Sequence, residues 1–111
     1  MDNTKNDRYY VEKIINDLKF VIDHTTGKTK DEIEADELLL DSIMFRIIQI
    51  SENYGKLTPQ FKADHADVPW LAIKGMRNRI VHDYGEVDLI VVYDTVINGI
   101  PKMLERLENI L

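Results

Sequence analysis

Residues 36–57 read DELLLDSIMFRIIQISENYGKL, and this stretch predicts the longest helix of the chain. Its main apolar positions alternate spacings of three and four residues, as in a coiled-coil seam. They are Leu40, Ile43, Ile47, Ile50, Tyr54 and Leu57. Met44, Ile48, Ser51 and Gly55 form a second stripe, whose small members let another helix approach closely. Two stripes require packing on two sides, which indicates the central helix of a bundle.

The segments on either side of this helix carry helical spacing bounded by start and stop signals. They predict further helices over residues 7–24, 30–35, 59–63, 70–84 and 89–111. Gly27 is suited to a left-handed cap, and Thr29 with Glu32 forms a capping box. Pro101 lacks a backbone N–H, so we expect a kink or a break in the last helix there. The expected fold class is all-α, a bundle of four to five main helices plus short helices with up-and-down packing.

Length and composition describe an ordinary globular chain. The 111 residues are expected to form one domain, 1–111, with 44% hydrophobic and 31% charged residues. The absence of cysteine excludes disulfides and thiolate zinc sites, and it fits a cytoplasmic location. The first six residues are polar, so we expect no signal peptide. No apolar run is long enough for a membrane span.

Residues 76–84 read MRNRIVHDY and concentrate side chains suited to phosphate chemistry. On a helix, Asn78 and His82 share one face, and Arg77 and Tyr84 share a second stripe. Arg77 and His82 are separated by about 140° around the helix axis. One regular helix therefore does not aim both side chains at one point. Either the last turn is distorted, or the site is shared between two copies of the chain in a dimer.

Histidine and arginine together point to a specific reaction. Histidine gives or takes a proton near neutral pH, and arginine presents a planar, charged fork to phosphate oxygens. With no metal ligands nearby, this pair indicates RNA cleavage in which the 2′-hydroxyl of the substrate attacks phosphorus. The alternative is structural, since the helix dipole also favours Arg and His in a last turn.

The pattern of Arg77, four residues, His82, one residue and Tyr84 resembles the R-x-x-x-x-H-x-Y motif of HEPN-domain proteins. More closely, it resembles the HepT toxins of HEPN–MNT toxin–antitoxin pairs, and Asn78 fits the broader HEPN pattern. Further likeness extends over essentially the whole chain, at residues 7–10, 35–39, 50–52, 68–70, 75–78 and 91–95.

This resemblance implies a HEPN-type bundle and a homodimeric, metal-independent ribonuclease toxin acting on transfer RNA or messenger RNA. It also implies a cognate MNT-type nucleotidyltransferase antitoxin as partner. His82 is then the general acid–base, Arg77 stabilises the phosphorane, and Asn78 orients the phosphate or the arginine. In HepT-like toxins the tyrosine of the motif receives adenylate from the partner, which implies adenylylation of Tyr84.

Two further residues are expected to support this site. Glu52 lies among apolar neighbours of the long helix, and a buried carboxylate needs a partner, for which Arg77 is the candidate. The alternative is a solvated Glu52. Arg79, together with Lys74 and Arg77, supplies local positive charge.

The net charge of −6 opposes general nucleic-acid binding, which uses basic surfaces. Asp83, Glu86 and Asp88 crowd the motif itself, so any positive potential must be local. Two alternatives therefore stay open: a non-catalytic HEPN module that binds a nucleotide or a nucleotidyltransferase, and a structural helical dimer without ligand. No glycine-rich phosphate loop or metal-ligand spacing is present in the sequence, so no cofactor or metal is predicted.

Overall fold

The computed structural model describes residues 6–111, except the side chain of Tyr84. Over these residues the chain forms helices and no strand, which confirms the all-α prediction. The elements are α1 (Asp7–Thr25), α2 (Lys30–Ala35), α3 (Glu37–Gly55), α4 (Pro59–Asp64), α5 (Trp70–Asp83), the 3-10 turn η1 (Tyr84–Glu86), α6 (Leu89–Asp94), the π-helix η2 (Thr95–Gly99) and α7 (Ile100–Ile110). The segment Met1–Lys5, expected not to be a signal peptide, lies outside the described residues.

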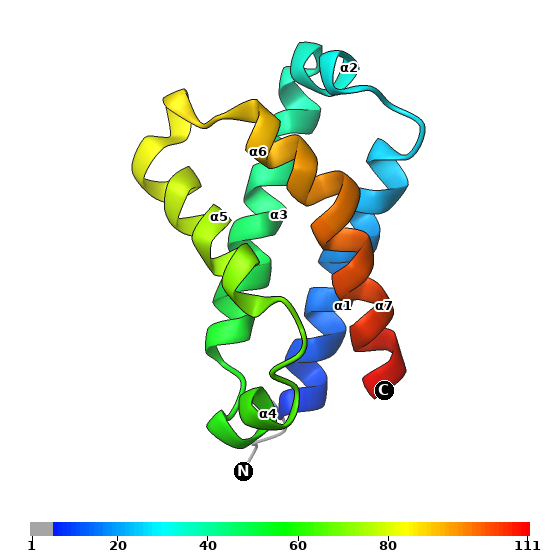
Figure 1. Ribbon diagram of the computed structural model, residues 1–111, viewed down its shortest axis with the longest axis vertical. Coiled ribbons are helices and arrows are strands. Elements are labelled where there is room, and N and C mark those ends of the chain that lie inside the picture. Colours follow the sequence, from blue (N-terminus) through cyan, green and yellow to red (C-terminus); the bar gives the residue numbers. More distant parts are fainter. Residues whose placement is uncertain (1–5) are drawn as a thin grey trace.

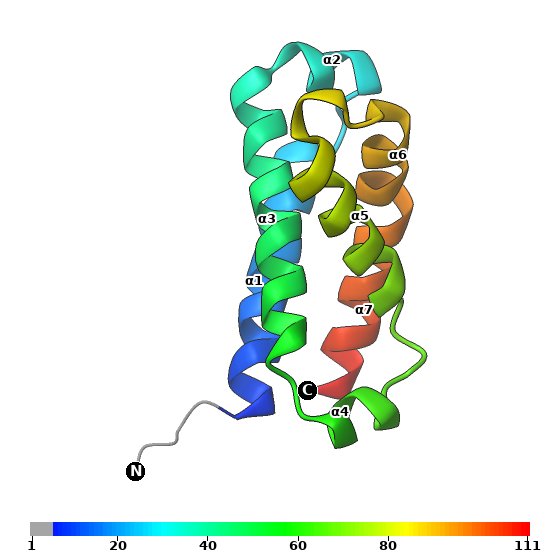
Figure 2. The same ribbon diagram turned by 90° about the vertical axis from the view of Figure 1, so that its left-hand side faces the viewer.

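The long helices are packed up and down along the long axis of the molecule (Figure 1). Helix α3 lies between α1 and α5 and packs against both of them (Figure 2). Helix α1 also packs against α7, which closes the bundle on its other side. The two-sided packing predicted for the long central helix is therefore confirmed.

The core forms along the predicted seam of α3. Ile43, Ile47 and Ile50 are fully buried, and Met44 of the second stripe is buried as well. The other long helices contribute fully buried apolar side chains to the same core. They are Ile14 and Leu18 of α1, Ile80 of α5, and Ile100, Met103 and Leu107 of α7. Among the described residues, no helix is both long and apolar enough to cross a membrane.

Local caps set the helix boundaries where the sequence placed them. Gly27 has a φ of 80°, the left-handed conformation expected after α1. Both halves of the capping box at α2 are present, since the Thr29 hydroxyl accepts from the Glu32 N–H and the Glu32 carboxylate accepts from the Thr29 N–H. These hydrogen bonds from Thr29 lower the pKa of Glu32 below its ordinary value.

The structure differs from the prediction at the end of α5, and it shows the form of the interruption in the last helix. Helix α5 leaves the α conformation after Asp83, before Gly85, and continues as one 3-10 turn. The interruption predicted for the last helix takes the form of a π-helix over Thr95–Gly99, where the Ile100 N–H donates to the Thr95 carbonyl and the chain continues as α7. This wider turn accommodates Pro101, which lacks a donor and would clash with the carbonyl four residues earlier.

Candidate functional site

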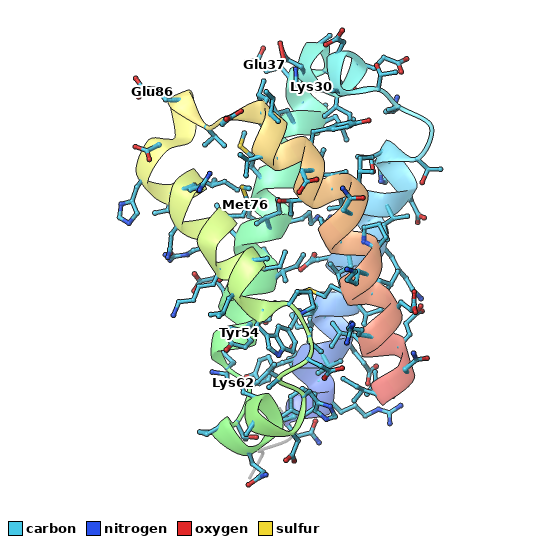
Figure 3. The ribbon with its side chains drawn as sticks, viewed as in Figure 1. Lys30, Glu37, Tyr54, Lys62, Met76 and Glu86 are labelled. Carbon is cyan, nitrogen blue, oxygen red and sulfur yellow. The ribbon has the colours of Figure 1, made fainter. Side chains whose placement is uncertain are left out.

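Helix α5 is held on the bundle by one buried stripe and leaves the motif on its remaining surface. Ile73, Met76 and Ile80 are buried against the core, and Figure 3 shows Met76 directed into the bundle. Trp70 anchors the start of the helix, where its ring stacks on Tyr54 with centroids 4.8 Å apart. The interpretation of Trp70 as a core residue fits its burial. This register places Arg77, Asn78 and His82 away from the core.

The Arg77 guanidinium is fixed from two directions. Its Nη2 and Nε atoms donate to Glu52 Oε1 at 3.0 and 3.3 Å, which joins α5 to α3. Its Nη1 atom donates to Asn78 Oδ1 at 3.2 Å. The predicted pairing of Glu52 with Arg77 is therefore confirmed, and Asn78 contacts the same guanidinium.

The predicted burial of Glu52 was wrong. Its side chain is 50% exposed, whereas that of Arg77 is 32% exposed. Glu52 follows Phe45 by seven residues on α3, and this spacing keeps both on the outward side of the helix. The apolar residues adjacent to Glu52 in sequence point to other sides of α3. The ion pair thus lies at the surface, accessible to solvent.

Two N–H groups of Arg77 remain available. A guanidinium carries five N–H donors, and three of them are used by Glu52 and Asn78. The other two, one on each Nη atom, have no acceptor among the described residues. A planar fork with two free donors and a fixed orientation is suited to bind the oxygens of a phosphate.

His82 is exposed in the last turn of α5, one turn after Asn78. The backbone departs from α geometry only at Asp83, with φ −132° and ψ 37°, after both Arg77 and His82. The end of the helix is distorted, but only after His82, so the distortion does not lie between Arg77 and His82. The separation of about 140° between Arg77 and His82 stands.

Charge is segregated along α5. Lys74 and Arg79 are exposed and have no carboxylate within ion-pair distance in the part of the chain that the structure describes. Arg79 lies one turn before His82 and so on the same side of the helix. Asp83 and Glu86 are exposed at the far end, where Figure 3 shows Glu86 at an outer corner. Beyond that corner, Asp88 accepts from the Ile90 N–H at 2.9 Å and caps α6.

The structure says less about Tyr84 and about metal ligands. Tyr84 begins the 3-10 turn η1, but its hydroxyl, expected near the catalytic groove, lies outside the described atoms. Within the described residues, no three His, Cys, Asp or Glu side chains are grouped so as to hold a metal. Phe45, an exposed aromatic residue on the same side of α3 as Glu52, was not predicted from the sequence. Its only sequence signal is the seven-residue spacing from Glu52.

Comparison with known proteins defines the class to which this fold and motif belong. The family model described as Ribonuclease HepT-like matches residues 14–110. The chain therefore belongs to the HepT-like, HEPN-type ribonuclease family. The relatives support a ribonuclease function for the class.

Three relatives have names that refer to RNase activity. A candidate RNase of Caldanaerobacter subterraneus subsp. tengcongensis is 28% identical over 107 residues, which cover 96% of each chain. A candidate RNase of Methanocaldococcus jannaschii is 26% identical over 96% of this chain and 88% of its own. A candidate ribonuclease HepT of Thermococcus cleftensis is 24% identical over 91% of this chain and 92% of its own. No solved structure matches the chain.

Proposed function

We propose that this protein is a metal-independent endoribonuclease in which Arg77 and His82 act on a phosphodiester of transfer RNA or messenger RNA. The observation that carries the proposal is the orientation of Arg77, which Glu52 and Asn78 hold at the surface while two of its donors have no acceptor among the described residues. His82, exposed on the same helix, supplies the proton-transferring group. Membership of a ribonuclease family supports RNA as the substrate.

The proposed reaction is transesterification by the RNA itself. The 2′-oxygen attacks phosphorus, the bond from phosphorus to the 5′-oxygen breaks, and the products are a 2′,3′-cyclic phosphate and a 5′-hydroxyl. One proton leaves the 2′-oxygen and one is gained by the 5′-oxygen, and His82 serves one or both transfers. The free N–H groups of Arg77 bind the non-bridging oxygens, where charge accumulates in the phosphorane. Asn78 keeps the guanidinium in position.

The proposed active form is a homodimer. Because α5 is regular through both residues, Arg77 and His82 of one chain diverge by about 140° around the helix. A two-fold axis beside α5 brings His82 of one copy toward Arg77 of the other across a common groove. Sedimentation is expected to give a dimer at micromolar concentration. A monomer that cleaves RNA at full rate contradicts the shared site.

A cleavage assay tests the proposal directly. The purified protein is incubated with total RNA in EDTA, beside His82→Ala and Arg77→Ala. Each substitution is expected to reduce cleavage by about 10²–10⁴-fold, the contribution of a general acid–base or of a charge-stabilising donor. His65→Ala is the matched control, since His65 lies in the loop between α4 and α5. Undiminished cleavage by His82→Ala, or cleavage that requires magnesium, refutes the mechanism. Binding without cleavage favours the non-catalytic module instead.

We also propose that a cognate nucleotidyltransferase antitoxin controls the enzyme by adenylylating Tyr84. The residue follows His82 by two positions and directly follows α5. Adenylate adds negative charge and bulk beside the phosphate site, which repels RNA without a change of fold. Tyr84→Phe is expected to keep ribonuclease activity and to escape inhibition by the partner with ATP. Intact-mass spectrometry decides, since a persistent mass gain in Tyr84→Phe rules out this residue as the target.

A further inference from the structure

A second surface feature lies on the opposite flank of α3 from Arg77. It is a groove of about 330 Å³ between α1 and α3, within the size range of ligand pockets. Phe45 of α3 lines this groove and is 55% exposed as a residue. An aromatic ring open to solvent beside a groove offers a flat apolar surface on which a planar group can stack.

The groove is not acidic, although the chain as a whole is. Its one carboxylate, Asp17, is buried and accepts from Arg46 Nη1 at 2.7 Å. The Arg46 guanidinium also lies over the Phe20 ring, 3.9 Å from the centroid. Lys13, also in the lining, has no ion pair with any described residue, so the lining carries a net charge of +1 on a chain of −6. A negatively charged strand is therefore tolerated here better than over most of the surface.

Three side-chain amides complete the lining of the groove. Asn53 is only 4% exposed, and its Nδ2 donates to the Gln49 carbonyl at 3.0 Å. The Oδ1 atom of Asn53 and the side-chain amides of Gln49 and Asn16 have no hydrogen-bond partner among the described residues. Each amide presents a donor beside an acceptor. This pattern matches the N6 and N7 edge of adenine, with which Asn and Gln pair in two hydrogen bonds.

We infer that this groove binds an unpaired adenine base of the RNA substrate. The base stacks on Phe45, its edge pairs with the side-chain amide of Gln49, and Lys13 attracts the adjoining phosphate. Recognition of single-stranded RNA uses the same combination of an aromatic platform and base-edge hydrogen bonds. The inference rests on the proposed ribonuclease function and adds a specificity site to it.

The position of the groove fits a strand that also reaches Arg77. Phe45 precedes Glu52 by seven residues, about 10 Å along the axis of α3. Helix α3, which carries Phe45 and Glu52, lies between α1, which borders the groove, and α5, which carries Arg77 (Figure 1). A strand that crosses α3 places a base in the groove and a nearby phosphate at Arg77.

Binding measured apart from cleavage tests the inference. Fluorescence anisotropy is recorded with the His82→Ala protein and labelled oligonucleotides of adenosine, of uridine and of abasic ribose phosphate, all of one length. Adenosine is expected to bind most tightly. Phe45→Ala should weaken adenosine binding by about 5- to 150-fold, the loss of one stacked base, and leave abasic binding unchanged. Phe45→Trp should retain the affinity, and Gln49→Ala should narrow the difference between adenosine and uridine.

Leu38→Ala is the matched control, because Leu38 is 79% exposed on the same helix and lies outside the groove. Circular dichroism verifies that each variant is folded. Unchanged adenosine binding by folded Phe45→Ala overturns the inference. So does a Phe45→Ala variant that alters sedimentation alone, since Phe45 then belongs to an interface between copies. If the wild-type protein cleaves RNA while all these oligonucleotides bind equally, only this inference fails. If it neither binds nor cleaves RNA, the proposed function fails as well.

Discussion

Glu52 offers the sharpest test of how Arg77 is positioned, because two substitutions separate its charge from its geometry. Glu52→Gln keeps an oxygen at the position that accepts from Arg77 at 3.0 Å and removes the negative charge. Glu52→Ala removes both and leaves Arg77 with Asn78 as its one remaining partner among the described residues. If Glu52 acts by orienting the guanidinium, the alanine variant loses activity and the glutamine variant largely keeps it.

The structure sets the expected magnitudes. The two side chains are 32% and 50% exposed, so their pairing contributes only about 0.2–1 kcal/mol to stability. The melting temperature should therefore fall by less than about 5 °C in either variant. Ordering a free arginine side chain costs about 2 kcal/mol of rotamer entropy, and the pairing with Glu52 orders Arg77 in part before the substrate binds. Release of the guanidinium should then cost about 1–2 kcal/mol in the transition state, or about 5- to 30-fold in kcat.

The assay compares kcat and KM for a short RNA in wild type, Glu52→Gln and Glu52→Ala. Glu52→Gln is expected to bind RNA more tightly and to keep kcat within a few-fold, because the charge of Arg77 is no longer neutralised. Glu12→Ala is the control, since Glu12 forms an exposed ion pair with Arg8 of the same 3.0 Å length on α1. A Glu52→Ala protein with wild-type kcat and KM refutes the positioning role. A fall in melting temperature above about 10 °C shows that Glu52 supports the fold instead.

Three further predictions concern stability and are read from thermal unfolding. Gly27→Ala should lower the free energy of unfolding by about 1–2 kcal/mol, because φ is 80° there and a Cβ disfavours this conformation. An unchanged melting temperature contradicts the role of Gly27 as a left-handed cap. Thr29→Ala should cost about 1 kcal/mol at neutral pH through loss of the capping box. The folded state lowers the pKa of Glu32, so the contribution of Glu32 to stability is present above the ordinary pKa of 4.5 and is lost as the pH falls through the lowered pKa. The difference in stability between Thr29→Ala and wild type should therefore shrink in acid. Trp70→Ala should cost about 3–5 kcal/mol, since it removes a buried ring and its hydrogen bond to the His65 carbonyl, and a loss below about 1 kcal/mol argues against an anchor.

Much of the fold was predictable because its signals are local. The alternating spacing on α3 placed Ile43, Ile47 and Ile50 in the core, and the capping residues set most helix starts within a residue. The form of the last helix was not predictable in this way. Pro101 indicates an interruption, but whether the chain kinks, breaks or widens into a π-helix depends on packing against the rest of the bundle.

For the candidate site, one contact between the predicted residues was predictable, whereas their surroundings were less so. The pairing of Arg77 with Glu52 followed from the need to neutralise a carboxylate, although Glu52 proved half-exposed. Neighbours in sequence on a helix point in different directions, so apolar neighbours do not establish burial. The groove beside Phe45 was not predicted. Its lining depends on the pairing of Asp17 with Arg46, which lies 29 positions later in the chain. A contact at that separation depends on the packing of α1 against α3.

The segregation of charge along α5 makes the proposed phosphate site compatible with an acidic protein. The exposed cations Lys74 and Arg79 and the half-paired Arg77 lie before His82, whereas the exposed carboxylates Asp83 and Glu86 follow it. At physiological ionic strength charges are screened over about 8 Å, so the local cations act on a bound strand more strongly than the distant net charge. Under the proposed mechanism, RNA is attracted along the first part of α5 and repelled at its end. Tyr84 begins the turn at this boundary, where the proposed adenylate would extend the negative region toward the proposed phosphate site.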